Sequence, residues 1–416
     1  MANGMANKSP AVIRTICLPI EEERYRQIVD DPAAFAAWLR DCFQRYPALF
    51  PEGFAQGFSM KDRRTSRKTS LLLRRIQLRD GSAYSIRPSF LMPYLTARTE
   101  DVQGPLFLRK FGMPFWALAR VFGRDPMYWF RLECQFGCNS IVGTTVRQTE
   151  IPKHLLADEH HQTCDGDKVY LATTVGGGCC LGVALAGSAS TEELTAAYGV
   201  FRSEARNVQP DYTPQTVNTD GWKGTQGAWL ALFPLVALLR CFLHGWLKIR
   251  DRVKNRKEQF FEVATRVWEA YHAPSKQTMA QRLCALAEWA RQHLNGSVLA
   301  EVEDLCVKSE LWQKAYEYPG GHRTSNMLDR IMRSMHRYFF SGQHLHGGGV
   351  ANQRHVRGWA LLCNFTPWHP ATARANGGWH SPAERLNQHR YHDCWLQNLL
   401  ISASLGGHRV CAPQKA

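Results

Sequence analysis

Three short apolar runs joined by Gly- and Asp-containing turns constrain the fold of this 416-residue chain most strongly. The runs cover residues 154–161, 168–175 and 179–186, and the turns between them are residues 164–167 and 176–178. Because β-branched and aromatic side chains favour strands, and tight turns of this kind join antiparallel neighbours, the segment is predicted to form a three-stranded meander.

A helix, a fourth strand and a further helix are predicted after the meander. Residues 190–193 have the spacing of a capping box, and apolar residues then recur at helical steps as far as residue 205. Residues 216–220 form a short β-like run that ends in an acid, and residues 225–239 are predicted to be helical. The order β-β-β-α-β-α predicts an α/β fold with a ribonuclease-H-like mixed sheet, in which the first and fourth strands are central neighbours.

The charge of the chain favours a polyanionic partner, with nucleic acid first. Lys and Arg number 51 against 36 Asp and Glu, which gives a formal net charge of +15. A basic block at residues 61–79 is predicted to contact DNA phosphates, with a solvated basic loop as the alternative. Its candidate contacts are Arg63, Arg64, Arg67 and Lys68.

The chain is predicted to have four parts. The first, residues 1–150, is expected to be a mainly helical DNA-binding region, in which residues 105–132 have the outline of a helix-turn-helix that simple helical packing also explains. Residues 151–246 begin the core and residues 247–321 form a helical insertion, while residues 322–416 hold the last core helices and the C-terminal region. The insertion opens with a basic run that adds Lys248 and Arg250 to the predicted DNA contacts.

Cysteine use and hydropathy favour a cytoplasmic protein without a membrane partner. The 13 Cys are odd in number and irregular in spacing, and no secretory leader precedes them, so reduced thiols are expected. The most apolar stretch, residues 228–239, is interrupted by Pro234 and is shorter than the roughly 20 residues that span a bilayer.

Three acids stand where nucleotidyl-transfer chemistry needs them. Asp158 lies in the first predicted strand, Asp220 ends the fourth, and Asp329 lies one turn into the helix after the insertion. Neighbouring carboxylates repel each other unless cations lie between them, and hard oxygen ligands suit Mg²⁺ or Mn²⁺. Two such ions about 3.5–4 Å apart would activate the attacking oxygen and stabilise the leaving oxygen of a phosphodiester.

Four motifs in this order resemble those of a DDE/D transposase of a bacterial insertion sequence, of the Mutator-related kind with a ribonuclease-H-like core. They are residues 156–160 around the first acid, residues 217–222 around the second, the Cys-x-x-His of residues 241–244, and Ser325-Asn326 followed by Asp329. The resemblance covers about residues 150–345. It implies cleavage of element ends and their joining to target DNA in a nucleoid-associated dimer or larger assembly, with double-stranded DNA of the terminal repeats and the target as partners.

The resemblance also assigns roles to individual residues, with one departure. The third acid is usually Glu, whereas this chain has Asp329, and Glu384 is the rival for that role, although Glu384 also suits a capping box with Ser381. Cys241 and His244 are implied to lie near the active site, and strand alternation puts His160 on the face of Asp158. Arg330 and Arg333 on the same helix as Asp329 are predicted to hold phosphates.

Two other functions remain open from the sequence. The first is a structure-selective nuclease of the same fold, which would cleave DNA without joining it. The second is a DNA-binding relative whose acids are structural, an alternative that the Asp-for-Glu departure leaves open. Mg²⁺-dependent cleavage separates this binder from the two enzymes, and strand transfer separates the transposase from the nuclease.

Overall fold

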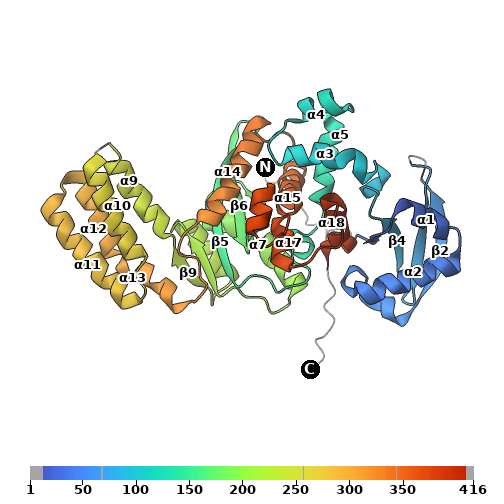
Figure 1. Ribbon diagram of the computed structural model, residues 1–416, viewed down its shortest axis with the longest axis horizontal. Coiled ribbons are helices and arrows are strands. Elements are labelled where there is room, and N and C mark those ends of the chain that lie inside the picture. The colour runs from blue at the N-terminus through green and yellow to red at the C-terminus, as the bar shows by residue number, and fades with distance from the viewer. Residues whose placement is uncertain (1–12, 67–68, 256, 343, 409–416) are drawn as a thin grey trace. The chain divides into compact units, whose positions relative to one another are not determined.

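The computed structural model describes residues 13–66, 69–255, 257–342 and 344–408 (Figure 1). The chain divides into two compact units. Unit 1 takes residues 1–151, 203–210 and 348–416, and unit 2 takes residues 152–202 and 211–347. The C-terminal segment therefore belongs to the same unit as the N-terminal region. Each unit has its own sheet, and both sheets mix parallel and antiparallel strands.

Unit 2 is built on a five-stranded sheet with the order β7-β6-β5-β8-β9. Its strands are β5 (His154–Cys164), β6 (Asp167–Gly176), β7 (Cys179–Ala186), β8 (Thr216–Thr219) and β9 (Ala237–Arg240). The first three form the predicted antiparallel meander, and β8 and β9 pair in parallel with β5 and β8. The meander and the central position of β5 beside β8 are confirmed.

The fifth strand corrects one prediction. Residues 225–239 were expected to form one helix, but the structure ends helix α8 (Lys223–Leu232) before Pro234 and begins β9 at Ala237. Proline cannot continue the backbone hydrogen bonds of a helix, so it separates two elements here. A short apolar run does not by itself distinguish a buried strand from a helix, which is why the sequence pattern misled.

Helices cover the two faces of this sheet (Figure 1). Glu159 of β5 accepts hydrogen bonds from Tyr198 of α7 (Thr191–Val208) and from Thr225 of α8, so these helices lie on one face. The next residue, His160, packs its ring against His336 of α14 (Asn326–Ser341) on the opposite face. Because side chains alternate along a strand, Asp158 shares the α14 face with His160.

A helical insertion with its own core lies between β9 and α14 in the sequence. It consists of α9 (Phe242–Val253), α10 (Lys257–Tyr271), α11 (Lys276–His293), α12 (Gly296–Val307), α13 (Ser309–Gln313) and the 3₁₀ turn η4 (Lys314–Glu317). Its buried side chains include Trp246, Ile249, Val267, Leu283 and Trp312. The predicted all-helical character of this segment is confirmed, and the apolar stripe of each helix explains the packing.

Unit 1 contains a second sheet, which the prediction of a mainly helical N-terminal region missed. Its strands β1 (Thr15–Leu18), β2 (Phe58–Thr65), β3 (Leu72–Leu78) and β4 (Ala83–Pro88) have the order β1-β4-β3-β2. The strand β2 is an edge strand with several exposed charged side chains, among them Arg63 and Arg64. Charged edges are how sheets avoid aggregation, but they also hide the apolar alternation that marks a strand in a sequence.

The other elements of unit 1 are helical. Before β2 come α1 (Glu22–Ile28), α2 (Pro32–Arg45), η1 (Pro47–Leu49) and η2 (Glu52–Gln56), and after β4 come η3 (Pro93–Leu95), α3 (Thr99–Arg109), α4 (Phe115–Phe122), α5 (Pro126–Phe136) and α6 (Ile141–Thr145). The C-terminal elements are α15 (Gly349–Phe365), α16 (Pro370–Ala375), α17 (Pro382–Asn387), α18 (Trp395–Ser402) and η5 (Ser404–Gly407). Across the described ranges, every helix is too short or too polar to cross a membrane.

Candidate active site

Asp158 and Asp220 come from the two central strands of the unit 2 sheet. In the parallel pair of β5 and β8, Leu156 is opposite Asn218. Two residues further along, the same register sets Asp158 beside Asp220, which directly follows β8. The backbone N–H of Glu159 donates to Asp158 Oδ1 at 2.8 Å, and the N–H of Trp222 donates to Asp220 Oδ1 at 2.8 Å. Both carboxylates are therefore oriented by the backbone next to them.

The electrostatics of this pair favour a bound cation. Burial, and after it the neighbouring charge of Asp220, raise the pKa of Asp158 to about 7. Such a shift means that the ionised form of Asp158 is disfavoured in the protein without a ligand. A positive ion between the two carboxylates would remove the repulsion, as happens in metal sites with oxygen ligands.

Cys241 and His244 lie beside the acid pair. Cys241 is the residue before α9, and His244 lies in the first turn of that helix. Interaction with the Cys241 sulfur raises the pKa of His244 to about 9 against the effect of burial, and Asp158 and Asp220 add to the rise. Burial raises the pKa of the Cys241 thiol, but hydrogen bonds with His244 and Ser325 outweigh it and the net shift is downward. The imidazole is thus a cation next to two acids.

Asp329 is connected to this group through a chain of hydrogen bonds. The Ser325 hydroxyl donates to Asp329 Oδ2 at 2.9 Å, and the Ser325 N–H donates to Cys241 Sγ at 3.2 Å. Two further bonds hold the segment before α14, since Asn218 Nδ2 donates to the His322 carbonyl at 2.8 Å and Phe242 N–H donates to that of Arg323 at 3.0 Å. The start of α14 is therefore fixed to the ends of β8 and β9.

The three predicted metal ligands do not form one cluster here. No group of three or more His, Cys, Asp or Glu side chains suited to a metal ion occurs in the described part of the chain. Asp158 and Asp220 interact directly, whereas the interactions of Asp329 are with Ser325. Hydrogen bonds through Ser325 and Cys241 hold Asp329 near the same ends of the strands, but Asp329 does not contact the acid pair directly.

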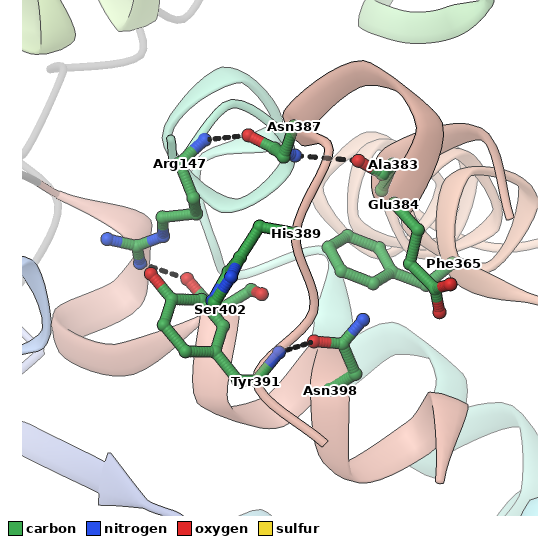
Figure 2. A pocket seen from close by; sticks show the side chains of 9 residues that line it. All are labelled: Arg147, Phe365, Ala383, Glu384, Asn387, His389, Tyr391, Asn398 and Ser402. Atoms are coloured by element: carbon green, nitrogen blue, oxygen red, sulfur yellow. Dashed lines mark hydrogen bonds between the residues drawn. The ribbon is translucent and has the colours of Figure 1, made fainter. Parts of the chain in front are cut away.

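Glu384, the rival third acid, belongs to unit 1 and is buried there with its own partners. Ser381 Oγ accepts the Glu384 N–H at 3.3 Å, and the Glu384 carboxylate accepts the His380 N–H at 3.0 Å. The carboxylate also lines a small pocket with Arg147 and Asn387, drawn in Figure 2, which has room for about one water molecule. The capping interpretation of Glu384 is therefore supported, with His380 in place of Ser381 as the reciprocal donor.

Two side chains on β5 complete the surroundings of the pair. Burial lowers the pKa of His160 to about 4, so its ring is neutral, and its Nε2 is buried without a hydrogen-bond partner in the described structure. Glu159 was not singled out from the sequence. It accepts hydrogen bonds from Tyr198 at 2.6 Å and Thr225 at 2.8 Å, and burial raises its pKa, with Asp220 adding to the rise. Only its position next to Asp158 could have drawn attention to it.

The residues of the predicted basic block fall on the hairpin of β2 and β3. Arg63 and Arg64 are exposed on β2, and Arg63 forms an ion pair with Asp30 at 3.2 Å. Arg67 and Lys68 lie outside the described residues. Arg74 is buried and donates to the backbone carbonyl of Asp30 at 2.8 Å. The block is therefore mostly a two-stranded hairpin instead of a loop, and part of its charge holds unit 1 together.

Four other predicted DNA contacts lie in unit 2. Arg330 and Arg333 are exposed on α14, on the side away from its buried stripe, and Lys248 is exposed on α9. Arg250 is also exposed, and it pairs with Asp251 at 3.0 Å. All four are accessible to a ligand.

The donor set around Asp158 and Asp220 fits a hard cation. Besides the two carboxylates, Nε2 of His160 is buried on the face of Asp158 without a hydrogen-bond partner in the described ranges. Buried polar groups are nearly always satisfied by protein, water or an ion. Two neighbouring carboxylates suit Mg²⁺ or Mn²⁺, because both ions prefer oxygen ligands and retain several waters.

No protein-family model matches this chain, and the search of curated proteins finds no match either. The arrangement of the site therefore carries the functional argument alone.

Proposed function

We propose that the chain is a DNA transposase of the DDE/D kind, with a ribonuclease-H-like core formed by β5 to β9 and their flanking helices. The observation that carries the proposal is the position of Asp158 on β5 beside Asp220, which follows the neighbouring parallel strand β8. The two negative charges repel each other, and this repulsion helps to raise the pKa of Asp158. The strand order β7-β6-β5-β8-β9 and the helices inserted after β9 also support it.

In this proposal, Asp158 and Asp220 would hold two Mg²⁺ or Mn²⁺ ions, and Asp329 would complete the set once its side chain turns away from Ser325. The ions supply Lewis-acid activation of an attacking oxygen and stabilisation of the leaving oxygen. Ser325 controls the orientation of Asp329 through its 2.9 Å hydrogen bond. Breaking that bond frees the carboxylate to turn toward the pair.

The cationic side chains around the pair have a second role, which is to hold the DNA backbone. Arg330 and Arg333 extend from α14 into solvent, and they bind phosphates of the strand that is cut. The positively charged His244 stabilises the ionised carboxylates of Asp158 and Asp220. Neutral His160, on the face of Asp158, is a hydrogen-bond partner for substrate or water.

Recognition of the element ends is assigned to unit 1. The exposed arginines of the β2–β3 hairpin supply sequence-independent phosphate contacts, and the helices α3 to α5 supply the helix-turn-helix candidate. Two ends have to be held together for transposition, so a dimer or larger assembly is part of the proposal.

A strand-transfer assay tests the proposal against its nearest rival. Purified protein is incubated with Mg²⁺, a labelled DNA that carries the ends of the element, and a target plasmid. A transposase yields labelled DNA joined covalently to the plasmid, whereas a nuclease of the same fold yields only cleaved fragments. Binding without cleavage would instead identify a DNA-binding relative.

A further inference from the structure

A small pocket of about 30 Å³ opens next to Asp220, where the sheet meets the helical insertion. Its lining includes Arg240 at the end of β9 and His244 and Lys248 on α9. The rest of the lining comes mainly from α12, α13 and the residue between them. All of these elements are in unit 2. The pocket therefore joins the acid pair to a set of charged side chains outside it.

The position of Arg240 depends on the glycine that follows Asp220. Arg240 is opposite Thr219 in the parallel register of β8 and β9. Gly221 has φ +97°, and a Cβ built on it would lie 2.4 Å from Cζ and 2.7 Å from Nη2 of Arg240. The missing side chain thus leaves the space that the guanidinium group occupies, directly beside the second acid of the pair.

The charges lining the pocket are unevenly satisfied. Among the lining acids, Asp304 is paired with Lys308, and Glu301 lies 3.7 Å from Arg252. Arg240 and Lys248, which also line the pocket, form no ion pair within the described ranges of the chain. Two cations without counter-ions, next to an acid pair suited to metal ions, are an arrangement that attracts an anion.

We propose that Arg240 and Lys248 bind a backbone phosphate of the DNA strand adjacent to the bond that is cleaved. This inference rests on the proposed function, because it takes Asp220 as a ligand of the catalytic ions. The guanidinium group of Arg240 presents a planar fork to two phosphate oxygens, and Lys248 adds a mobile point charge from α9. Glu301 and Asp304 on α12 repel a phosphate, so the phosphate is expected to bind beside Arg240 and Lys248.

A free phosphate ion or a nucleotide presents the same chemistry, and lysine footprinting distinguishes these sources from DNA. The full chain is acetylated in EDTA, so that no cleavage occurs, with a duplex plasmid fragment, inorganic phosphate or no addition. DNA is expected to slow acetylation of Lys248 by about fivefold, in line with a phosphate contact, and to leave Lys168 at the β5–β6 turn unchanged. Unprotected Lys248 would overturn the inference. Equal protection by inorganic phosphate at the same phosphate concentration would assign the pocket to a small anion instead.

Substitutions of Arg240 and Lys248 test whether the pocket contributes to DNA cleavage. Arg240→Gln and Lys248→Gln are each expected to lower kcat/KM for Mg²⁺-dependent DNA cleavage by about tenfold, and to reduce the log–log salt slope of DNA binding by about 0.9. Lys248→Arg should restore most of the loss, and Lys168→Gln is the matched control. Because Lys248 is exposed, its substitution leaves the fold intact.

The outcomes separate the two proposals. Wild-type levels of cleavage by both Gln variants would contradict the pocket assignment and leave the transposase proposal standing. A wild-type protein that cleaves no DNA, while DNA still protects Lys248, would contradict the proposed function and support the pocket as a DNA-phosphate site.

Discussion

Asp158 and Asp220 lie level with each other on neighbouring parallel strands, and the charge of Asp220 helps to raise the pKa of Asp158 to about 7. The parallel pairing of β5 and β8 enforces this closeness, because strands in a sheet are only about 4.8 Å apart. The fold thus holds two like charges together at an energetic cost. Strongly shifted carboxylates are concentrated at functional sites, which is why we propose this pair as the catalytic centre.

The free energy of unfolding of the metal-free protein is expected to fall as the pH rises from about 4 to about 7. The folded pKa of Asp158 is raised from 3.8 to about 7, so the folded state holds a proton in this window that the unfolded state has released. Asp158→Asn removes the titration. At pH 8 the variant should be more stable than wild type by about 1–3 kcal/mol, measured by urea denaturation in EDTA. Equal stability of the two proteins at pH 8 would show that the ionised Asp158 carboxylate does not lower the free energy of unfolding.

Substitutions of Asp329 and Glu384 should have different effects, the first on DNA cleavage and the second on the free energy of unfolding. Asp329→Asn is expected to lower Mg²⁺-dependent DNA cleavage by about 100-fold while changing the free energy of unfolding by less than about 0.5 kcal/mol, because Asp329 is partly exposed and its carboxylate accepts a hydrogen bond from Ser325. Glu384→Gln should instead destabilise unit 1, where the carboxylate is buried and accepts the His380 N–H. Cleavage lost with Glu384→Gln in a protein of unchanged stability would reverse the assignment.

Gly221→Ala and Gly166→Ala form a matched pair. Their φ angles are +97° and +96°, so alanine costs about 1–2 kcal/mol of stability at either position. A Cβ at Gly166 meets nothing within 4 Å, whereas one at Gly221 displaces the end of the flexible Arg240 side chain. We expect similar falls in melting temperature but weaker DNA cleavage for Gly221→Ala alone. Equal activities of the two variants would show that the position of Arg240 is unimportant.

The hairpin of β2 and β3 should govern the salt dependence of DNA binding. Replacing exposed Arg63 and Arg64 with Gln is expected to reduce the slope of log affinity against log salt by about 1.8, from two phosphate contacts. The double variant of Arg26 and Arg45 is the control, because these exposed arginines pair with acids on their own helices. A slope that changes as much in the control would indicate only the effect of net charge. Fluorescence anisotropy over a salt series gives the measurement.

Much of the unit 2 fold was predictable from the sequence because its signals are local. The Gly-rich turns fixed the meander, and the apolar stripes of the insertion gave its helices. The strand β9 was missed because its four residues, Ala237–Arg240, carry the same apolar signal as a helix. The sheet of unit 1 was missed for the opposite reason, since its edge strand β2 is mostly polar and charged.

Some residues of the candidate site were predictable from the sequence, and others were not. Asp158, Asp220, Cys241 and His244 were predicted to be neighbours, and the electrostatic interactions of His244 with the other three bear this out. The role of Ser325 as the partner of Asp329 depends on a hydrogen bond between side chains, which no pattern of residue types specifies. The same holds for Arg240, since its place over Gly221 follows from the register of β8 and β9.

The most direct test of the acid pair as the catalytic centre is Mg²⁺-dependent cleavage of DNA by Asp220→Asn, measured beside DNA binding in EDTA. Asp211→Asn, which changes an exposed acid in the same unit, is the control. We expect that wild type and Asp211→Asn cleave, that Asp220→Asn loses at least about 1,000-fold in rate, and that all three bind DNA with similar affinity. Cleavage by Asp220→Asn at the wild-type rate would contradict the assignment of the acid pair as the catalytic centre.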